Sequence, residues 1–128
     1  MPMGQSQIKR MFRAFSDPTR LRILHLLLNG ELSVSDLVRV LRVPQPTVSR
    51  HLAYLRKAGL VLARKKGLWI HYRLTPARTE FHRQLLACVR CCFRDVPQFR
   101  EDEKRVALLQ KAGKRTRSIR ANDPSTCC

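Results

Sequence analysis

Closely spaced turn signals divide the first half of this chain into short helical segments. Asp17-Pro18 is typical of a helix start, because aspartate is a good N-cap and proline fits the first helical position. Asn29-Gly30 and Ala58-Gly59 are typical of helix ends, where glycine is favoured. Apolar residues recur with helical spacing between these signals. The pattern predicts helices over about 7–15, 18–28, 34–41 and 45–58.

The third and fourth predicted helices are separated only by Arg42-Val43-Pro44. Ser33 is the expected cap of the third helix, and Pro46 fits the first turn of the fourth. Two helices joined by a turn of three or four residues form a helix-turn-helix. We therefore predict this motif between residues 34 and 58.

Two β-type runs follow, over residues 60–65 and 68–74, and Lys66-Gly67 between them suits a tight hairpin. Alternation in the second run predicts a core face made of Leu68, Ile70, Tyr72 and Leu74. Thr75-Pro76 is then expected to begin a long helix over about 76–94. This order of elements is that of a winged helix-turn-helix domain, so we expect a mainly α fold with a small β-hairpin.

The charge of the chain predicts a polyanionic partner. Its 26 Lys and Arg residues outnumber 9 Asp and Glu residues, which gives a formal net charge of +17. Nucleic acid and an anionic membrane surface are the two candidates. No apolar run approaches the 18 or so residues of a membrane span, and no secretory signal is visible. We therefore expect a cytoplasmic protein without a membrane partner.

The 128 residues suffice for one domain. We assign residues 1–98 to the winged helix-turn-helix and dimerisation domain, and 99–128 to a basic C-terminal extension that is partly disordered. Val106, Leu108 and Leu109 suit a short helix in this extension. From Lys111 to Arg120 five basic residues meet no acidic one, so a disordered tail is expected from Gly113 onward.

Three thiols lie within five residues, at Cys88, Cys91 and Cys92. Their spacing of i, i+3 and i+4 places them on one face of a helix, close enough to reach one small thiophilic ion. In a reducing cytoplasm such thiols suit a soft-ion or redox sensor better than a disulfide framework. Inert packing is the alternative. The terminal pair Cys127-Cys128 is a weaker candidate for supplying further thiols.

Three motifs, in the right order, resemble the ArsR/SmtB family of bacterial metalloregulatory repressors. They are Phe15-Ser16-Asp17-Pro18-Thr19-Arg20-Leu21-Arg22-Ile23-Leu24, Pro46-Thr47-Val48-Ser49-Arg50-His51-Leu52 and Leu55-Arg56-Lys57-Ala58-Gly59-Leu60-Val61. The resemblance covers about residues 11–94. It implies a homodimer that represses a resistance operon until a toxic metal or metalloid releases it from double-stranded operator DNA.

The chain departs from the arsenic-binding pattern of the founding members. Their third helix carries Glu-Leu-Cys-Val-Cys-Asp-Leu, whereas the matching stretch here has Ser33 and Ser35 in place of both cysteines. Hydroxyls are poor ligands for soft ions, so that inducer site is absent. Some family members instead carry thiols on the closing helix, where Cys88, Cys91 and Cys92 lie.

Three thiols without an obvious fourth ligand suit As(III) or Sb(III) better than tetrahedral zinc. The family's zinc site needs a second histidine or a glutamate after a histidine on the closing helix, and His82 has no histidine after it. His82 and His25 are therefore weak ligand candidates. Cadmium or lead remains an alternative, with the shell completed by water, a partner-chain residue or a tail cysteine. No resident cofactor is required.

The predicted DNA-contacting residues lie on two elements. Recognition helices contact base edges through their first turns, which here hold Gln45, Thr47, Ser49, Arg50 and His51. The predicted hairpin tip carries Arg64, Lys65 and Lys66, which suit phosphate or minor-groove contacts. The alternatives are that Thr47 and Ser49 only cap and solvate the helix and that the hairpin cations form a solvated face.

The sequence thus favours a transcriptional repressor over an enzyme, because no catalytic arrangement is visible. Its inducer is expected to be trivalent arsenic or antimony. A repressor that senses oxidants or reactive sulfur is the main alternative, and a constitutive architectural DNA-binding protein is another. A dimer interface is expected from Ile8, Met11, Phe12 and Phe15 on the first helix and from Phe81, Leu85, Leu86 and Val89 on the closing helix.

Overall fold

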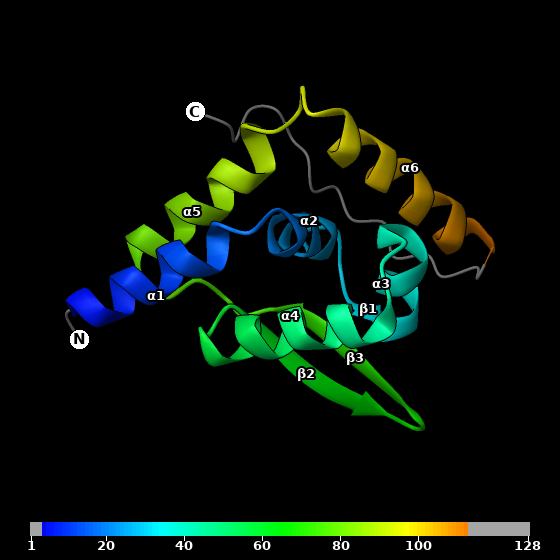
Figure 1. Ribbon diagram of the computed structural model, residues 1–128, viewed down its shortest axis with the longest axis horizontal. Helices are drawn as coiled ribbons and strands as arrows, with labels where there is room; N and C mark the ends of the chain where they lie inside the picture. Colours follow the sequence, from blue (N-terminus) through cyan, green and yellow to red (C-terminus); the bar gives the residue numbers. More distant parts are fainter. Residues whose placement is uncertain (1–3, 113–128) are drawn as a thin grey trace.

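The helices and strands of the computed structural model, which describes residues 4–112, follow the predicted order (Figure 1). They are α1 (Gln5–Phe15), α2 (Pro18–Leu27), β1 (Leu32–Ser33), α3 (Val34–Leu41), α4 (Gln45–Lys57), β2 (Val61–Lys66), β3 (Trp69–Leu74), α5 (Glu80–Cys91) and α6 (Pro97–Ala112). Helices α3 and α4 form the helix-turn-helix, and β2 and β3 form the hairpin. The predicted tail from Gly113 on, with Cys127 and Cys128, lies outside the described residues.

Side-chain caps set the starts of α2, α3 and α5. The Asp17 carboxylate accepts a hydrogen bond from the Arg20 N–H at 3.0 Å, as predicted for the start of α2. Ser33 and Asp36 form a reciprocal capping box at the start of α3. The predicted start of the closing helix is wrong, because α5 is capped by Thr79. The Thr75 N–H instead donates to the Leu60 carbonyl at 2.9 Å, which keeps that residue extended.

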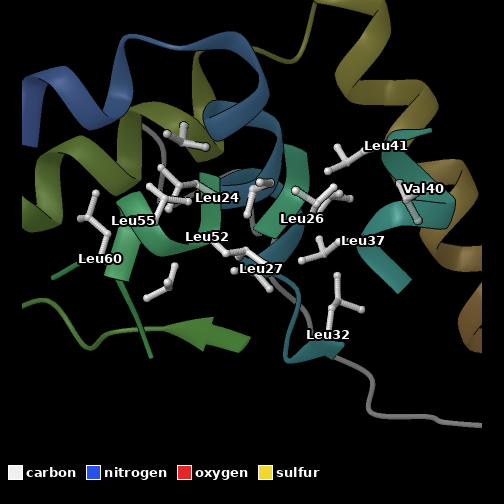
Figure 2. Close-up of a cluster of buried hydrophobic side chains, with 14 of the residues drawn as sticks. Leu24, Leu26, Leu27, Leu32, Leu37, Val40, Leu41, Leu52, Leu55 and Leu60 are labelled. Atoms are coloured by element: carbon white, nitrogen blue, oxygen red, sulfur yellow. The ribbon is translucent and has the colours of Figure 1, made fainter. Parts of the chain in front are cut away.

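The core lies where α2, α3 and α4 meet. Leu24 and Leu26 of α2 point into it together with Leu37 of α3 and Leu52 and Leu55 of α4, as Figure 2 shows. All five leucines are fully buried. Burying a leucine side chain contributes about 1.5–3 kcal/mol. This cluster therefore fixes α4 against α2, and with it the outward face of α4.

The sheet differs from the prediction in two ways. It contains a third strand, β1, which pairs antiparallel with β3 in the order β1-β3-β2. The hairpin turn lies one residue later than predicted, because Lys66 pairs with Trp69 and Gly67, at φ 63°, begins the turn. Two residues of β1 carry too little pattern for sequence reasoning to find.

The core face predicted for the second strand holds only at the base of the hairpin. Tyr72 and Leu74 pack on the core, but Leu68 is 92% exposed and Ile70 is also exposed. The hairpin projects beyond the helices (Figure 1), so Leu68 and Ile70 near its tip are not covered by the core. Alternation along a strand therefore overestimated how much of it is buried.

Helices α1 and α5 lie side by side (Figure 1), and the Phe12 and Phe81 rings meet edge to face at 5.2 Å between centroids. Of the residues predicted for a dimer surface, Met11 and Val89 are buried within the single chain. Phe12 keeps 54% of its surface exposed. Within residues 4–112, no helix has the length and hydrophobicity that a membrane span requires.

Helix α6 extends the domain beyond the boundary that we placed at residue 98. Its Val106 belongs to the same hydrophobic cluster as α2 and α3, and Phe99 is also buried. Asp102 of α6 is fully buried and receives two hydrogen bonds from Arg22 of α2, at 2.8 and 2.9 Å. Such bidentate pairs are strong and directional. The described part of the basic extension is thus an integral helix of the fold.

His25 adds a second contact between α2 and α6. Its Nε2 lies 3.2 Å from the Glu103 carboxylate, and its ring packs edge to face on Phe99. Burial lowers the pKa of His25 below its ordinary value of 6.5, although Glu103 and Asp102 act in the opposite direction. His25 is therefore a packing residue at the α2–α6 contact.

The buried pair yields a stability prediction. Asp102→Ala should lower the free energy of unfolding by about 3–5 kcal/mol, because Arg22 would retain a largely buried charge without its partner. Urea unfolding followed by circular dichroism measures this change. Glu101→Ala is the matched control, since its surface pair with Arg105, at 3.4 Å, is worth about 0–1 kcal/mol. Equal losses in the two variants would contradict the role assigned to Asp102.

Three histidines predict how stability depends on pH. Burial lowers the pKa of His25, His51 and His82 in the folded chain, so the folded state binds fewer protons than the unfolded state near pH 6.5. The contribution of the three neutral histidines to the free energy of unfolding is therefore complete above pH 6.5, and it is lost as the pH falls below that value. Each contributes a slope of at most about 1.4 kcal/mol per pH unit.

Urea unfolding at pH 7.5 and at pH 5.5 should show lower stability at the acidic value. His82→Gln should reduce this difference, because it removes one of the three groups. A stability that is flat or that rises on acidification would show that these histidines are not buried as described.

Candidate nucleic-acid interface and thiol cluster

The first turns of α4 present polar side chains outward. Gln45, Ser49 and Arg50 are exposed, and Thr47 is half-buried. Pro44 occupies the N-cap position, and no side chain caps the helix. Thr47 and Ser49 therefore do not cap the helix, and solvation of its surface is the alternative to DNA contact. These four side chains form a face that can meet a groove of duplex DNA.

His51, also predicted to contact DNA, faces the interior. Its Nδ1 lies 3.3 Å from the Arg20 guanidinium, and its Nε2 lies 3.8 Å from the Asp17 carboxylate. Burial lowers the pKa of His51, Asp17 opposes this, and Arg20 and Arg50 lower it further. His51 thus contacts the start of α2, where it helps to orient α4.

Two of the three hairpin cations share one carboxylate. Glu31 Oε1 lies 3.1 Å from Arg64 and 3.2 Å from Lys66. Lys65 alternates with them and so projects from the opposite face of β2. Partial burial would raise the pKa of Glu31, but the hydrogen bonds from Lys66 and Arg64 outweigh it and lower the pKa. Sequence reasoning missed this contact, because Glu31 lies more than thirty residues away.

These two ion pairs lie at the surface, with about half of each cationic side chain exposed. Surface pairs are worth about 0–1 kcal/mol, so a phosphate can replace the carboxylate at small cost. The hairpin runs alongside α4 (Figure 1). Its cations and the outward face of α4 together form one candidate surface for DNA.

Arg20 connects α1, α2 and α4, a role that we did not predict from sequence. Its guanidinium donates to the carbonyls of Ala14 at 3.0 Å and Arg13 at 2.9 Å, at the end of α1. It also stacks 4.1 Å from the centroid of the Tyr54 ring on α4. Planar guanidinium groups suit such combined hydrogen bonding and stacking. Arg20 therefore fixes the position of α1 relative to α4.

The three predicted thiol ligands lie at the end of α5. Cys88 is exposed, and Cys92 is the exposed C-cap residue, whose N–H donates to the Cys88 carbonyl at 2.8 Å. This bond keeps the last turn helical. Cys91 is half-buried and forms a disulfide, so the expectation of three thiols is wrong at this position. Adjacent residues on a helix point about 100° apart. Within residues 4–112, accordingly, no three histidine, cysteine or acidic side chains are placed to hold a metal ion.

Three thiolates are a suitable donor set for a soft trivalent ion. They form here only when the Cys91 disulfide is reduced, and their convergence requires the end of α5 to unwind. The stretch that carries cysteines in the founding arsenic repressors has a different use here. Ser33 Oγ accepts the Asp36 N–H at 3.1 Å as a helix cap, and Ser35 is exposed.

Comparison with known proteins gives a consistent result. The model of a family described as bacterial regulatory protein, arsR family, matches residues 17–62. The chain is 53% identical over 68 residues to the arsenical resistance operon repressor of Escherichia coli K12, which covers 52% of this chain and 58% of that protein. It is 42% identical over 77 residues to the arsenic resistance transcriptional regulator ArsR2 of Pseudomonas putida, covering 59% of this chain and 67% of the relative.

Solved structures show the same fold. HlyU from Vibrio cholerae aligns with a TM-score of 0.63 at 30% identity, over 73% of this chain and 98% of HlyU. Mb0332 from Mycobacterium bovis is described as a homodimeric winged helix-turn-helix DNA-binding domain and a possible ArsR-family transcriptional regulator. It aligns with a TM-score of 0.58 at 33% identity, over 66% of this chain and 75% of Mb0332. These matches confirm the predicted fold. The curated relatives are transcriptional regulators, which confirms the prediction that the chain is not an enzyme.

Proposed function

This chain belongs to the ArsR family of bacterial regulatory proteins, and on that premise we propose that it is a DNA-binding transcriptional repressor. It leaves double-stranded operator DNA when Cys88, Cys91 and Cys92 bind trivalent arsenic or antimony. The matched segment spans little more than half of the Escherichia coli repressor's own length, at 58%. The proposal therefore rests on the residues of this chain as well as on its relatives.

The outward face of α4 supports the DNA-binding part of the proposal. Gln45 and Arg50 can reach base edges from the first turns, while Thr47 and Ser49 can donate to bases or to nearby phosphates. The hairpin supplies Arg64, Lys65 and Lys66 for phosphates beside them. A net charge of +17 favours association with any polyanion, so base contacts from α4 must supply the preference for one sequence.

The thiol cluster is the single observation that carries the inducer assignment. Cys88 of α5 and Cys92 at its C-cap are both exposed, and Cys91 between them forms a disulfide that must be reduced before this residue can bind an ion. Trivalent arsenic and antimony take three sulfur ligands, and a thiol deprotonates as it binds. The relative from Escherichia coli is an arsenical resistance repressor, although its inducer is not thereby transferred to this chain.

Release from DNA would follow from unwinding the end of α5. This helix packs on α2 and, through Phe81, on α1. In the proposed homodimer the exposed Phe12 and its neighbours on α1 and α5 meet the second copy. A change in α5 then alters the spacing of the two α4 helices. Linkage requires DNA to weaken arsenic binding by the same factor by which arsenic weakens DNA binding. A shift from about 99:1 to 1:99 in the ratio of DNA-bound to released protein needs about 5.5 kcal/mol of differential binding free energy.

The exposure of Cys88 and Cys92 also favours a second candidate, a repressor of the same fold that senses oxidants or reactive sulfur. Accessible thiols one turn apart can form a disulfide or persulfide instead of binding an ion. Cadmium or lead would need a fourth ligand besides the three thiols. All of these functions place the protein in the cytoplasm, where the DNA is.

The deciding experiment titrates the protein into DNA from the promoter region of its own gene, in reducing buffer, with and without arsenite. Release by arsenite supports the proposal. Release only by polysulfide or peroxide would support the second candidate, and release only by cadmium or lead would support the four-coordinate alternative. Equal binding to scrambled DNA without any effect of thiol reagents would indicate an architectural DNA-binding protein.

The thiols give the first prediction for this function. Cys88→Ser, Cys91→Ser and Cys92→Ser should each bind the operator normally, since none lies near α4. Each should raise the arsenite concentration for half-release by at least about tenfold, which corresponds to about 1.4 kcal/mol. Fluorescence anisotropy with labelled operator DNA measures both quantities.

Ser35→Ala is the control for the thiol series, because Ser35 is exposed at one of the two serine positions. It should leave the arsenite response unchanged. A triple serine variant that arsenite still releases at the parent concentration would place the sensor elsewhere.

Variants that lose a base contact and variants that lose a phosphate contact should differ in their preference for operator over scrambled DNA. Arg50→Ala should reduce the preference for operator over scrambled DNA by about 1–3 kcal/mol, as expected for a lost base contact. Lys65→Ala should weaken binding to both duplexes equally, because phosphates carry no sequence information. Competition binding with both duplexes at one salt concentration measures the two effects. The reverse pattern would mean that the hairpin reads the sequence.

A further inference from the structure

A basic groove lies between α1 and the C-terminal half of α4. It encloses about 510 Å³. Its lining residues are Ser6, Lys9, Arg10, Arg13, Tyr54, Lys57 and Ala58. Four of these residues are cationic and none is acidic. None of the four forms an ion pair within residues 4–112.

The groove is held in shape by Arg20. Its hydrogen bonds to the end of α1 and its stacking on Tyr54 hold the two walls together. The guanidinium lies behind the Tyr54 ring and adds a further positive charge near the groove. Cations that converge on a preformed site repel one another unless an anion lies between them. The arrangement therefore fits an anionic ligand.

The groove continues the proposed DNA-contacting face of α4. Arg50, Tyr54 and Lys57 follow one another at i, i+4 and i+7, which is one stripe on a helix. The 13 residues of α4 span about 20 Å, whereas the major groove of B-DNA is about 12 Å wide. When the first turns of α4 enter the major groove, its last turn must therefore extend to the phosphates that border it.

We propose that this groove binds the phosphate backbone of the same duplex that α4 contacts. Lysine, arginine and tyrosine hydroxyl groups are typical phosphate ligands. A second copy of this chain is a poor occupant of the groove, because four cations line it and the Phe12 side chain of the proposed dimer contact does not. This inference rests on the proposed DNA-binding function and adds a second backbone contact to it.

The two backbone contacts lie at opposite ends of α4. Helix α4 ends at Lys57, and β2 starts at Val61 and runs back alongside it to the hairpin tip (Figure 1). The hairpin tip and the α1–α4 groove thus lie on either side of the residues that face the bases. They are placed to hold the phosphates on the two sides of one major groove.

The test uses the full chain with Lys9→Gln and Lys57→Gln combined, which removes one cation from each wall. The control combines Arg83→Gln on α5 with Lys104→Gln on α6, which removes the same charge from exposed sites away from α4. Binding to operator and to scrambled duplex is measured over a range of salt concentrations. Thermal unfolding of both variants verifies that each is folded.

Each phosphate contact contributes about 0.9 to the slope of log Kobs against log salt. The groove variant should therefore show a slope that is smaller in magnitude by about 1.8 for each bound protomer. Its binding to both duplexes should be weaker by the same factor. The control should keep the parent slope. Hydroxyl-radical footprinting should show that the groove variant loses protection on the side away from the hairpin contact.

Equal slopes for the groove and control variants would overturn the inference, as would an unchanged footprint. If sedimentation instead showed that the groove variant alters self-association, the groove would be an interface between copies. A parent chain without preference for operator over scrambled DNA would refute the proposed function itself, whatever the groove variant does.

Discussion

Burial of α2 on nearly every side is the constraint on which the rest of the structure depends. Helices α1, α3, α4, α5 and α6 and strand β3 all contact it. Ile23, Leu24 and Leu26 are completely buried, so each neighbouring helix contributes an apolar face to the same cluster. Removing any of these helices would expose apolar surface on α2. We therefore expect the domain, with α6 included, to unfold as one cooperative unit.

The two arginines of α2 direct how its neighbours are arranged. Arg20 holds the end of α1 and the Tyr54 ring of α4, whereas Arg22 holds Asp102 of α6 and donates to the Leu41 carbonyl of α3. Helix α5, which carries the thiols, packs on the same helix. A change at the end of α5 therefore has a short, well-packed route to α4 through α2. Side chains in such cores shift between discrete arrangements rather than deform continuously.

Local signals in the sequence were sufficient for the helix-turn-helix, because caps such as Asp17 and Ser33 act on residues three positions away. They failed where partners are distant in sequence. Neither β1 nor the depth of α6 was predicted, since both depend on contacts with β3 and Arg22. Arg20 and His51 lie in motifs that support the family resemblance, but only the fold shows that they contact each other. The thiol cluster was found from spacing alone, and its use remains a proposal.

The carboxylate of Glu31 has a consequence for how such a protein would search a genome. A chain with so large a positive charge would remain for a long time on every stretch of DNA it meets. Glu31 already forms ion pairs with two of the hairpin cations, so a phosphate that approaches them gains less binding free energy. In the proposed repressor, the intramolecular anion would thereby shorten residence on unrelated sequences, while base contacts from α4 would prolong it at the operator. Scanning would be faster because the contact that is weakened is the one that does not distinguish sequences.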